Sequence, residues 1–501
     1  MRLQTVCFVI FVTAVFGADV DNETLFTFPE DFKLGAATAS YQIEGGWNAD
    51  GKGVNIWDTL THERSQLVVD KSSGDVADDS YHLYKEDVKL LKNMGAQLYR
   101  FSISWARILP EGHDNKVNQA GIEYYNKLID ELLDNGIEPM VTMYHWDLPQ
   151  TLQDLGGWPN RELAKYSENY ARVLFQNFGD RVKLWLTFNE PLTFMDAYAS
   201  ETGMAPSIDT PGIGDYLAAH TVILAHANIY RMYEREFKEE QKGKVGIALN
   251  IHWCEPVTNS TKDVEACERY QQFNLGIYAH PIFSVEGDYP SVLKARVDAN
   301  SVTEGYTTSR LPKFTTEEVD FIRGTHDFLG LNFYTAVTGA DGVEGEPPSR
   351  YRDMGAITSQ DPDWPESASS WLRVVPWGFR KELNWIANEY GNPPIYITEN
   401  GFSDYGGLND TDRVLYYTEH LKEMLKAIHI DEVNVVGYTA WSLVDNFEWL
   451  RGYTERFGIH EVNFNDPSRP RVPKESAKVL TEIFNTRRIP ERFLDHHHHH
   501  H

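Results

Sequence analysis

Short β-rich runs alternate with longer segments of helical spacing along most of the chain, and this alternation restricts the fold more than any other feature. The β-rich runs cover residues 33–39, 98–102, 139–144, 184–188, 245–250, 328–333, 395–398 and 435–440. Between them, segments such as 81–94 and 122–135 carry apolar residues at the three- and four-residue intervals of a helix. Eight alternations favour a parallel sheet, and eight is the number of strands that closes into a barrel.

An open, doubly wound sheet is the alternative architecture for such an alternation. That fold would be expected to carry a Gly-rich phosphate loop after an early strand, but neither GxGxxG nor GxxxxGK[ST] occurs in the sequence. No low-complexity tract, charge block or Gly/Ser linker divides the chain. We therefore predict an α/β fold consisting of one (β/α)8 TIM barrel, in which the long connections 189–244 and 253–325 are elaborated βα loops and helices.

Helix boundaries are visible in two of these segments. Asp78, Asp79 and Ser80 stand just before the first helix and are suitable capping residues. Asn135 and Gly136 are expected to stop the second helix before the next strand.

The two ends of the chain are predicted to lie outside the barrel domain. Residues 1–17 combine Arg2, an apolar run over 6–16 and a small residue, which is typical of a secretory signal peptide. Residues 496–501 are a histidine tag, so the domain is assigned to residues 18–495. No later run reaches the roughly 20 apolar residues of a spanning helix. The N-x-Ser/Thr sequons at Asn22, Asn259 and Asn409 agree with secretion.

The charge balance restricts the partners. The chain has 74 Asp and Glu residues against 46 Lys and Arg residues, which gives a formal net charge of -28 at pH 7. Because this field repels polyanions, nucleic acid and anionic membrane surfaces are not expected as partners. Aromatic residues make up 13% of the chain, and they serve either a large core or a cleft that stacks against the apolar face of a sugar ring.

Cys254 and Cys267 remain once Cys7 is removed with the predicted signal peptide. In an oxidising compartment they either form a disulfide that closes a short loop or stay as buried free thiols. Without a CxxC or histidine pattern around them, two cysteines do not make a zinc site.

Polar side chains follow almost every predicted strand. In a (β/α)8 barrel the functional groups lie at the C-terminal ends of the strands. The residues at these positions are Gln42 and Glu44, Arg100, His145, Trp146 and Asp147, Asn189 and Glu190, Asn250, Asn332 and Tyr334, Glu399 and Asn400, and Trp441 with Glu448. Most of these side chains bind hydroxyl groups or move protons, so this end of the barrel is predicted to be the functional one.

Glu190 and Glu399 end two predicted strands that lie on opposite sides of the barrel, so both carboxyl groups can reach one central cavity. A glutamate that follows buried strand residues is costly unless it is paired or used. Two carboxyl groups that flank a sugar are what glycoside hydrolysis needs. A structural pair of salt-bridged glutamates is the alternative.

The sequence around both glutamates resembles that of family 1 glycoside hydrolases, the β-glucosidase family. Residues 187–191 read TFNEP and residues 397–401 read ITENG. The likeness covers almost the whole chain and includes residues 32–45, 99–105, 144–149, 441–449 and 456–458. In overall character the chain resembles an animal, insect-type, secreted β-glucosidase.

This resemblance implies a retaining mechanism in which Glu190 is the acid/base and Glu399 is the nucleophile. By the same likeness Arg100 and Tyr334 hold Glu399 ionised, Arg100 through its charge and Tyr334 through a hydrogen bond. A retaining pair lies about 5–5.5 Å apart, so an ionised Glu399 keeps Glu190 protonated until the glycosyl-enzyme forms. Because two carboxyl groups and water suffice for this chemistry, the resemblance implies neither a metal nor an organic cofactor.

The glucose-binding residues also follow from the resemblance. Hydrogen bonds to sugar hydroxyls are implied for Gln42, His145, Asn189, Glu448 and Trp449, with Asn189 gripping the 2-hydroxyl. Ordinary core packing is the alternative for His145 and Trp449. An acidic Glu448 would accept hydrogen bonds from the 4- and 6-hydroxyls and repel a 6-phosphate, for which phospho-glycosidases carry serine.

Three tryptophans complete the implied site. Trp441 would form the platform beneath the glucose ring. Trp371 resembles the residue on which the leaving group stacks at the mouth of the cleft. Trp377 either lines the same opening or packs against its loop.

The expected function is hydrolysis of terminal non-reducing β-D-glucosyl residues of cellobiose, short cellooligosaccharides or aryl glucosides, with β-D-galactosides and β-D-fucosides as further candidates. The expected location is extracellular, such as a digestive lumen where cellulose is degraded. Two alternatives stay open. An insect-type thioglucosidase would keep Glu190, whereas plant thioglucosidases carry glutamine there. A non-catalytic binding protein on the same barrel would typically have lost one glutamate, and this chain has both.

Overall fold

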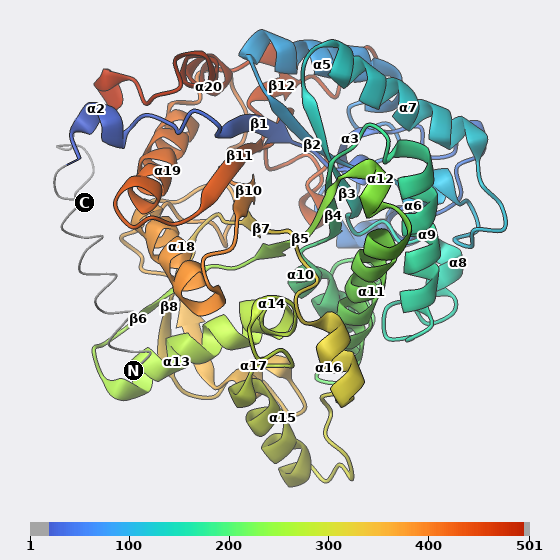
Figure 1. Cartoon of the computed structure of the whole chain (residues 1–501), viewed down its shortest axis with the longest axis vertical. Helices are drawn as coiled ribbons and strands as arrows, with labels where there is room; N and C mark the ends of the chain where they lie inside the picture. The colour runs from blue at the N-terminus through green and yellow to red at the C-terminus, as the bar shows by residue number, and fades with distance from the viewer. Residues whose placement is uncertain (1–19, 495–501) are drawn as a thin grey trace.

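The computed structural model describes residues 20–494 and contains a closed barrel of parallel strands (Figure 1). In chain order the barrel strands are β1, β2, β3, β4, β5, β7, β10 and β11, and β11 pairs with β1 to close the ring. The predicted fold class is therefore confirmed. The predicted signal peptide over 1–17 and the tag over 496–501 lie outside the described residues.

The barrel strands lie close to the predicted runs. Their bounds are β1 (Lys33–Ala37), β2 (Leu98–Ser102), β3 (Glu138–Tyr144), β4 (Leu184–Asn189), β5 (Lys244–Asn250), β7 (Phe328–Asn332), β10 (Ile395–Glu399) and β11 (Val435–Trp441). The first strand ends two residues earlier than predicted. Ala39 is still extended, but it precedes helix α3 (Ser40–Ile43), which turns the chain over the end of the barrel.

Helices surround the barrel and connect its strands (Figure 1). The longer ones are α5 (Ser80–Met94), α7 (Gln119–Asp134), α9 (Leu163–Phe178), α11 (Gly214–Glu236), α13 (Thr261–Gln271), α15 (Ser291–Thr303), α18 (Pro376–Tyr390), α19 (Thr411–His429) and α20 (Glu475–Thr486). The shorter ones are α2 (Asn22–Leu25), α4 (Ile56–Glu63), α6 (Trp105–Ile108), α8 (Gln150–Gln153), α10 (Pro191–Met195), α12 (Lys238–Gln241), α14 (Ile277–Phe283), α16 (Thr316–Ile322) and α17 (Arg350–Met354).

The two predicted helix boundaries have different outcomes. Helix α5 begins at Ser80, but the prediction that Asp79 caps it is wrong, because Asp79 has φ 54° and its side chain makes no capping hydrogen bond. The Asp79 carboxylate contacts His82 instead, at 2.7 Å. Helix α7 ends at Asp134, and Gly136 follows with φ 72°, the left-handed conformation that stops a helix.

The interior of the barrel changes from apolar to polar along the strands. A separate buried cluster consists of Leu98, Met140, Leu184, Leu186, Ala248, Phe328 and Tyr396. Because strand side chains alternate between faces, the residues two positions further on face the same interior. In β2, β3 and β10 these residues are the buried Arg100, Thr142 and Thr398. This polar layer forms the floor of a cavity at the C-terminal ends of the strands.

Two small sheets, which the sequence did not predict, lie outside the barrel. One contains β6 (Trp253–Pro256), β8 (Ala336–Asp341) and β9 (Ala356–Ser359), and the other contains β12 (His460–Val462) and β13 (Arg471–Pro473). A disulfide between Cys254 and Cys267 joins β6 to α13, which decides between the two alternatives for these cysteines.

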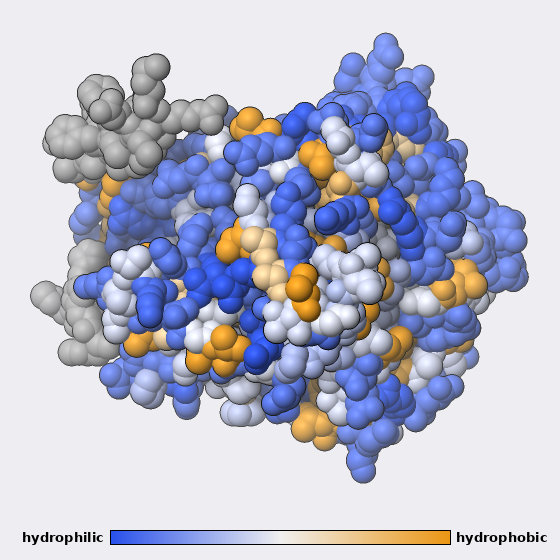
Figure 2. All heavy atoms as spheres, turned by 90° about the horizontal axis from the view of Figure 1, so that it is seen from below, coloured by the Kyte–Doolittle hydropathy of each residue, from blue (hydrophilic) through white to orange (hydrophobic). Residues whose placement is uncertain are grey.

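The face of the molecule that Figure 2 shows is mainly hydrophilic. Figure 2 shows one face of the molecule, on which hydrophobic residues are scattered among hydrophilic ones. Within residues 20–494, no helix has the length and apolar character that crossing a membrane requires.

Candidate active site

A cavity of about 240 Å³ opens at the C-terminal ends of the barrel strands. Two larger grooves, of about 660 and 750 Å³, lie among surface loops and chain ends instead. The cavity contains both glutamates and every predicted sugar-binding residue. Its lining consists of Gln42, His145, Trp146, Asn189, Glu190, Thr193, Met204, Asn250, His252, Asn332, Tyr334, Trp371, Glu399, Trp441, Glu448, Trp449 and Phe457.

Glu399, the last residue of β10, is held by two donors. Arg100 Nη1 donates to Oε2 at 2.7 Å, and the Tyr334 hydroxyl donates to Oε1 at 2.7 Å. Burial, followed by the charge of Glu399, raises the pKa of Tyr334 well above its usual range, so Tyr334 remains a donor. A buried carboxylate needs a partner, and here one oxygen faces a permanent cation.

Glu190 follows β4 and faces the same cavity with uncharged partners. Its Oε2 accepts a hydrogen bond from Asn332 Nδ2 at 2.8 Å, and its Oε1 accepts one from the Thr193 hydroxyl at 2.8 Å. Burial, followed by the negative charge of Glu399, raises the pKa of Glu190 to about 7. The two carboxyl groups therefore have different environments, and such a difference separates acid from base.

Asn189 connects the partners of the two glutamates. Its Oδ1 accepts hydrogen bonds from Arg100 Nη2 at 2.6 Å and from Asn332 Nδ2 at 2.9 Å. Its Nδ2 lies 3.0 Å from His145 Nε2. Since two donors fix the amide oxygen, the amide nitrogen is directed toward His145.

Five buried polar atoms of the cavity have no hydrogen-bond partner within residues 20–494. They are Gln42 Oε1, His145 Nδ1, Asn250 Oδ1, His252 Nδ1 and Glu448 Oε2. Buried polar atoms are normally paired, so these atoms are suited to bind a polar ligand or water. Burial, followed by nearby carboxylates, raises the pKa of Glu448 well above its usual range. Burial lowers the pKa of His145 well below its usual range, so its ring is neutral.

Aromatic rings form the inner wall of the cavity. The His145 ring is nearly parallel to the rings of Trp441 and Trp449, with 5.9 Å between centroids in both pairs. Trp146 packs on Trp449 at 4.5 Å. The alternative that His145 and Trp449 are ordinary packing residues is thus partly right, because both pack against aromatic neighbours while they line the cavity.

Three residues that line the cavity have a left-handed backbone conformation. Trp146, Glu190 and Trp449 have φ values of 81°, 49° and 48°, in the left-handed region. Such conformations cost non-glycine residues about 1–3 kcal/mol and persist where the surrounding structure imposes them, often at active sites.

Trp371 forms the outer wall and is 39% exposed. Its ring lies 5.9 Å from that of His252, 5.4 Å from that of Tyr334 and 6.5 Å from that of Phe457. Trp377 is not part of the lining, and it packs on Trp364 at 6.1 Å. Trp377 was expected either to line the opening of the cleft or to pack against its loop, and the structure agrees with packing against the loop.

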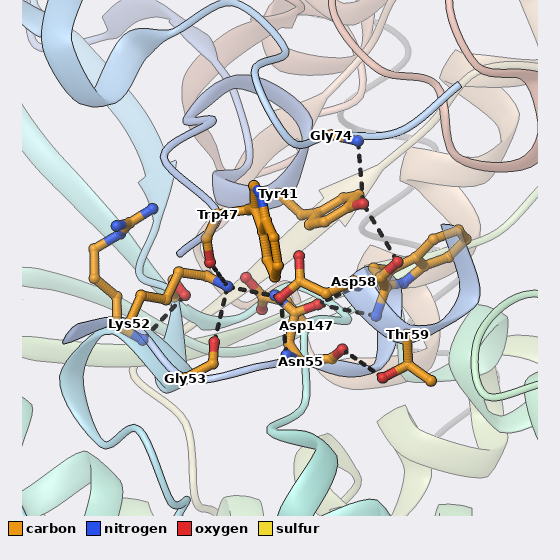
Figure 3. A network of polar contacts seen from close by, with 12 residues as sticks. Tyr41, Trp47, Lys52, Gly53, Asn55, Asp58, Thr59, Gly74 and Asp147 are labelled. Atoms are coloured by element: carbon orange, nitrogen blue, oxygen red, sulfur yellow. Dashed lines mark hydrogen bonds and ion pairs between the residues drawn. The ribbon is translucent and has the colours of Figure 1, made fainter. Parts of the chain in front are cut away.

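Figure 3 shows a polar network that includes Lys52, Asp58 and Asp147. Lys52 Nζ pairs with Asp58 at 2.7 Å and also donates to two backbone carbonyls. Asp147, two residues after a cavity histidine, accepts a hydrogen bond from the hydroxyl of Ser40 at 2.6 Å. Ser40 stands two residues before Gln42, so Asp147 ties the connection after β3 to the one after β1. Burial raises the pKa of Asp147 to about 7.

Some predicted strand-end residues do not reach the cavity. Glu44 pairs with Arg107 at 3.0 Å, and Asn400 donates to the carbonyl of Phe333 at 2.8 Å. Arg100 is in the middle of β2 and lies beneath the lining rather than in it. A strand-end position alone does not show whether a side chain points into the barrel axis or toward a neighbouring loop.

Sequence reasoning gave no site role to four residues of the cavity, which are Thr193, Met204, His252 and Phe457. Thr193 contacts Glu190 from the first turn of α10, three residues further on. Glu190 immediately precedes this helix, so a hydroxyl three residues further on, in the first turn, is the signal that identifies Thr193. His252 lies just beyond Asn250, and its position at the end of β5 is the corresponding signal.

Known proteins share both this sequence and this architecture. The family model described as Glycosyl hydrolase family 1 matches residues 25–489. Myrosinase 1 of Brevicoryne brassicae is 47% identical over 463 residues, covering 92% of this chain and 99% of that protein. Cytosolic beta-glucosidase of Homo sapiens is 47% identical over 462 residues, covering 91% and 97%. The solved structure of an aphid myrosinase matches with a TM-score of 0.89 at 47% identity, covering 92% of this chain and 99% of that one.

Proposed function

Since the chain belongs to glycosyl hydrolase family 1 and is a glycoside hydrolase, we propose that it is a retaining β-glucosidase with Glu399 as nucleophile and Glu190 as acid/base. The observation that carries this proposal is the contrast between two buried carboxyl groups in one cavity. Glu399 is paired with a guanidinium, whereas the pKa of Glu190 is raised to about 7. A retaining glycosidase needs one ionised carboxylate and one protonated carboxyl group in its resting state.

The first chemical step forms a glycosyl-enzyme. Glu399 attacks the anomeric carbon, the bond from that carbon to the leaving oxygen breaks, and Glu190 gives its proton to this oxygen. Arg100 and Tyr334 keep Glu399 ionised and oriented for the attack. Asn189, fixed by Arg100, is in position to grip the 2-hydroxyl, a contact that strengthens in the transition state.

The second step returns the enzyme to its resting state. The ester removes the charge on Glu399, so the pKa of Glu190 falls, and Glu190, which has given its proton to the leaving group, stays ionised. It then takes a proton from water, whose oxygen attacks the anomeric carbon and releases Glu399. Two inversions at one carbon leave the β-configuration unchanged.

The inner half of the cavity supports glucose as the glycone. Gln42 Oε1, His145 Nδ1 and Glu448 Oε2 are unpaired polar atoms that sugar hydroxyls would satisfy. Trp441 and Trp449 offer aromatic faces to the ring. These contacts favour terminal β-D-glucosyl residues, with β-D-galactosyl and β-D-fucosyl residues as related substrates.

The outer half supports a neutral leaving group. Among the described residues that line the cavity there is no Lys or Arg. Burial lowers the pKa of His252 to about 4, so it carries no charge near neutral pH. An anionic aglycone would find carboxyl groups and no cation here, whereas the second glucose of cellobiose or an aryl alcohol would stack on Trp371.

Thioglucoside hydrolysis is the second candidate, because a myrosinase is among the similar proteins. Glu190 does not distinguish the two activities in an insect-type enzyme. The absence of Lys and Arg from the described lining favours neutral thioglucosides over anionic ones, if sulfur-linked substrates are cleaved.

We further propose that the enzyme acts outside the cell, in the digestion of cellulose-derived oligosaccharides. The apolar segment over 6–16 supports secretion. Asn22, Asn259 and Asn409 are all exposed, so each sequon is accessible to glycosylation.

The test is the initial rate on matched O- and S-aryl β-D-glucosides, cellobiose, and the aryl β-D-galactoside and β-D-fucoside, with Glu399→Gln as control. Glucoside and cellobiose turnover that is lost in Glu399→Gln, with β-glucose as the first product by NMR, is the expected result. Turnover of the S-glucoside alone would favour the second candidate. Near-normal activity of Glu399→Gln would refute the assigned nucleophile, and saturable binding without hydrolysis would favour a binding protein.

A further inference from the structure

Glu455 is a buried carboxylate outside the cavity, in the connection that follows β11. It is 2% exposed, and the mechanism above does not use it. Its Oε1 accepts a hydrogen bond from the Ser369 hydroxyl, and its Oε2 accepts one from Arg451 Nε. Burying a carboxylate costs several kcal/mol unless donors compensate it, so these contacts are needed to keep it in place.

Ser369 links this carboxylate to two further connections. Ser369 lies between β9 and α18, whereas Ser403 lies after β10. The Ser403 hydroxyl donates to Ser369 Oγ at 2.8 Å and accepts the Ser369 N–H at 3.0 Å. Both serines are buried. Glu455 is therefore the final acceptor of a hydrogen-bond chain that runs from Ser403 through Ser369 and joins three connections at the mouth of the barrel.

The same chain fixes the start of the segment that carries Trp371. Leu372 N–H donates to the Ser369 carbonyl at 3.1 Å, which closes a tight turn with Trp371 inside it. The Trp371 ring then packs between His252 and Phe457 at the mouth of the cavity. Because the turn is short, a shift of Ser369 displaces the Trp371 ring.

We propose that Glu455 is a positioning residue for the leaving-group side of the cavity, where it anchors Ser369 and so holds Trp371 in place for an aglycone to stack on it. The inference rests on the proposed function, because it takes Trp371 to face a leaving group. Asn189 and His145, on the glucose side, are held by each other and by Arg100 instead. Through Ser369, Glu455 acts on the aglycone side, whereas its charge also raises the pKa of Glu448 on the glucose side, so Ser369→Ala is the variant that isolates the contact toward Trp371.

Two substitutions test this role by kinetics. Ser369→Ala removes the connecting hydroxyl without changing the charge, and Glu455→Ala removes the acceptor. Both are expected to raise KM for cellobiose about tenfold, with a smaller change in kcat. Ser369→Ala is expected to leave inhibition by glucono-δ-lactone, which fills only the glucose side, within about twofold of the unsubstituted enzyme. Equal changes in lactone inhibition and in KM would overturn the inference.

A double-mutant cycle tests the route through Trp371. In a Trp371→Ala background, Ser369→Ala is expected to change KM for cellobiose by less than about twofold, because the ring on which the aglycone stacks is already absent. A tenfold effect that persists in this background would show that Ser369 acts by another route and would overturn the inference.

A third measurement does not depend on turnover. The protein is labelled with 5-fluorotryptophan, and the 19F resonance of Trp371 is assigned by its loss in Trp371→Phe. Ser369→Ala and Glu455→Ala are expected to shift or broaden this resonance, whereas the control Glu461→Gln, in β12, is expected to leave it unchanged. An unchanged Trp371 resonance in folded Ser369→Ala would overturn the inference. If the unsubstituted protein does not hydrolyse β-glucosides, the proposed function is refuted, whereas the structural link from Glu455 to Trp371 is still tested by the 19F resonance.

Discussion

Arg100 and Glu399 are 299 positions apart in the sequence and form a buried ion pair, with 2.7 Å between Nη1 and Oε2. The side chain of Arg100 is 0% exposed and that of Glu399 is 5% exposed. Both charged groups are buried away from water, so each is stable in the protein interior only because the other is present. The fold itself thus places a permanent cation against the proposed nucleophile before any substrate binds.

Arg100→Met is expected to lower the free energy of unfolding by about 3–5 kcal/mol, because it leaves Glu399 buried without a cation. Turnover is expected to fall sharply at the same time, since an unpaired Glu399 takes up a proton and no longer attacks. Urea denaturation and initial rates check both effects. The double variant Arg100→Met/Glu399→Gln is expected to recover part of the stability, and no recovery would contradict the ion-pair explanation.

The pKa of about 7 for Glu190 predicts the alkaline limb of the pH–rate profile. As pH rises through about 7, kcat/KM is expected to fall, because ionised Glu190 cannot protonate the leaving oxygen. Thr193→Val removes a hydrogen bond that lowers this pKa, so the limb is expected to move to higher pH. An alkaline limb that stays in place in Thr193→Val would argue against Glu190 as its origin.

The same group makes folding stability depend on pH. Its folded pKa lies above its unfolded value, so its contribution to stability is complete below the usual pKa of 4.5 and is lost as pH rises through about 7. Glu190→Gln is expected to remove this pH-dependent part of the free energy of unfolding. Denaturation curves of both proteins across this range provide the comparison, and parallel pH dependences would contradict the assignment.

Asp147 is expected to support the glucose side of the cavity from behind. Asp147→Ala leaves the Ser40 hydroxyl without its acceptor, so it is expected to cost about 1–3 kcal/mol of stability and to raise KM for glucosides. Asp147→Asn keeps an acceptor for Ser40 and is expected to retain most of both properties. Thermal unfolding and KM for an aryl glucoside test this, and equal losses in the two variants would rule out the hydrogen bond as the cause.

The disulfide between Cys254 and Cys267 closes a loop with a sequence separation of 13. Replacing both cysteines with serine is expected to lower the free energy of unfolding by about 3 kcal/mol, because the unfolded chain gains conformational freedom. Denaturation with and without a reductant measures this effect. A reductant that destabilises the double variant as much as the unsubstituted protein would contradict it.

The barrel was largely predictable from the sequence, because buried parallel strands read as continuous apolar runs with a fixed order of helices between them. Residues 98–102 match β2 in both bounds. The small sheets of β6, β8 and β9 and of β12 and β13 were not predictable, since their strands of three to six residues carry no clear periodicity. The failed cap at Asp79 has a similar origin, because its left-handed backbone is imposed by the tertiary structure.

The candidate site was predictable in its residue types but not in its contacts. Motif resemblance gave Glu190 and Glu399, and the structure brings both into one cavity. Thr193 and His252 were missed, and Glu44 was included although it pairs with Arg107 behind the wall. Each of these differences concerns the direction in which a side chain points after its strand ends, which depends on the loop around it.

By itself, the sequence determined the order of strands and helices, the family and the two glutamates, because these are encoded in local patterns and short motifs. Only the tertiary structure decided that Arg100 faces Glu399, that Asn332 and Thr193 face Glu190, and that Glu455 anchors the segment of Trp371. These contacts join residues from different connections. The acidity of a carboxyl group depends on its burial and on the charges within a few ångströms, and closure of the barrel fixes both.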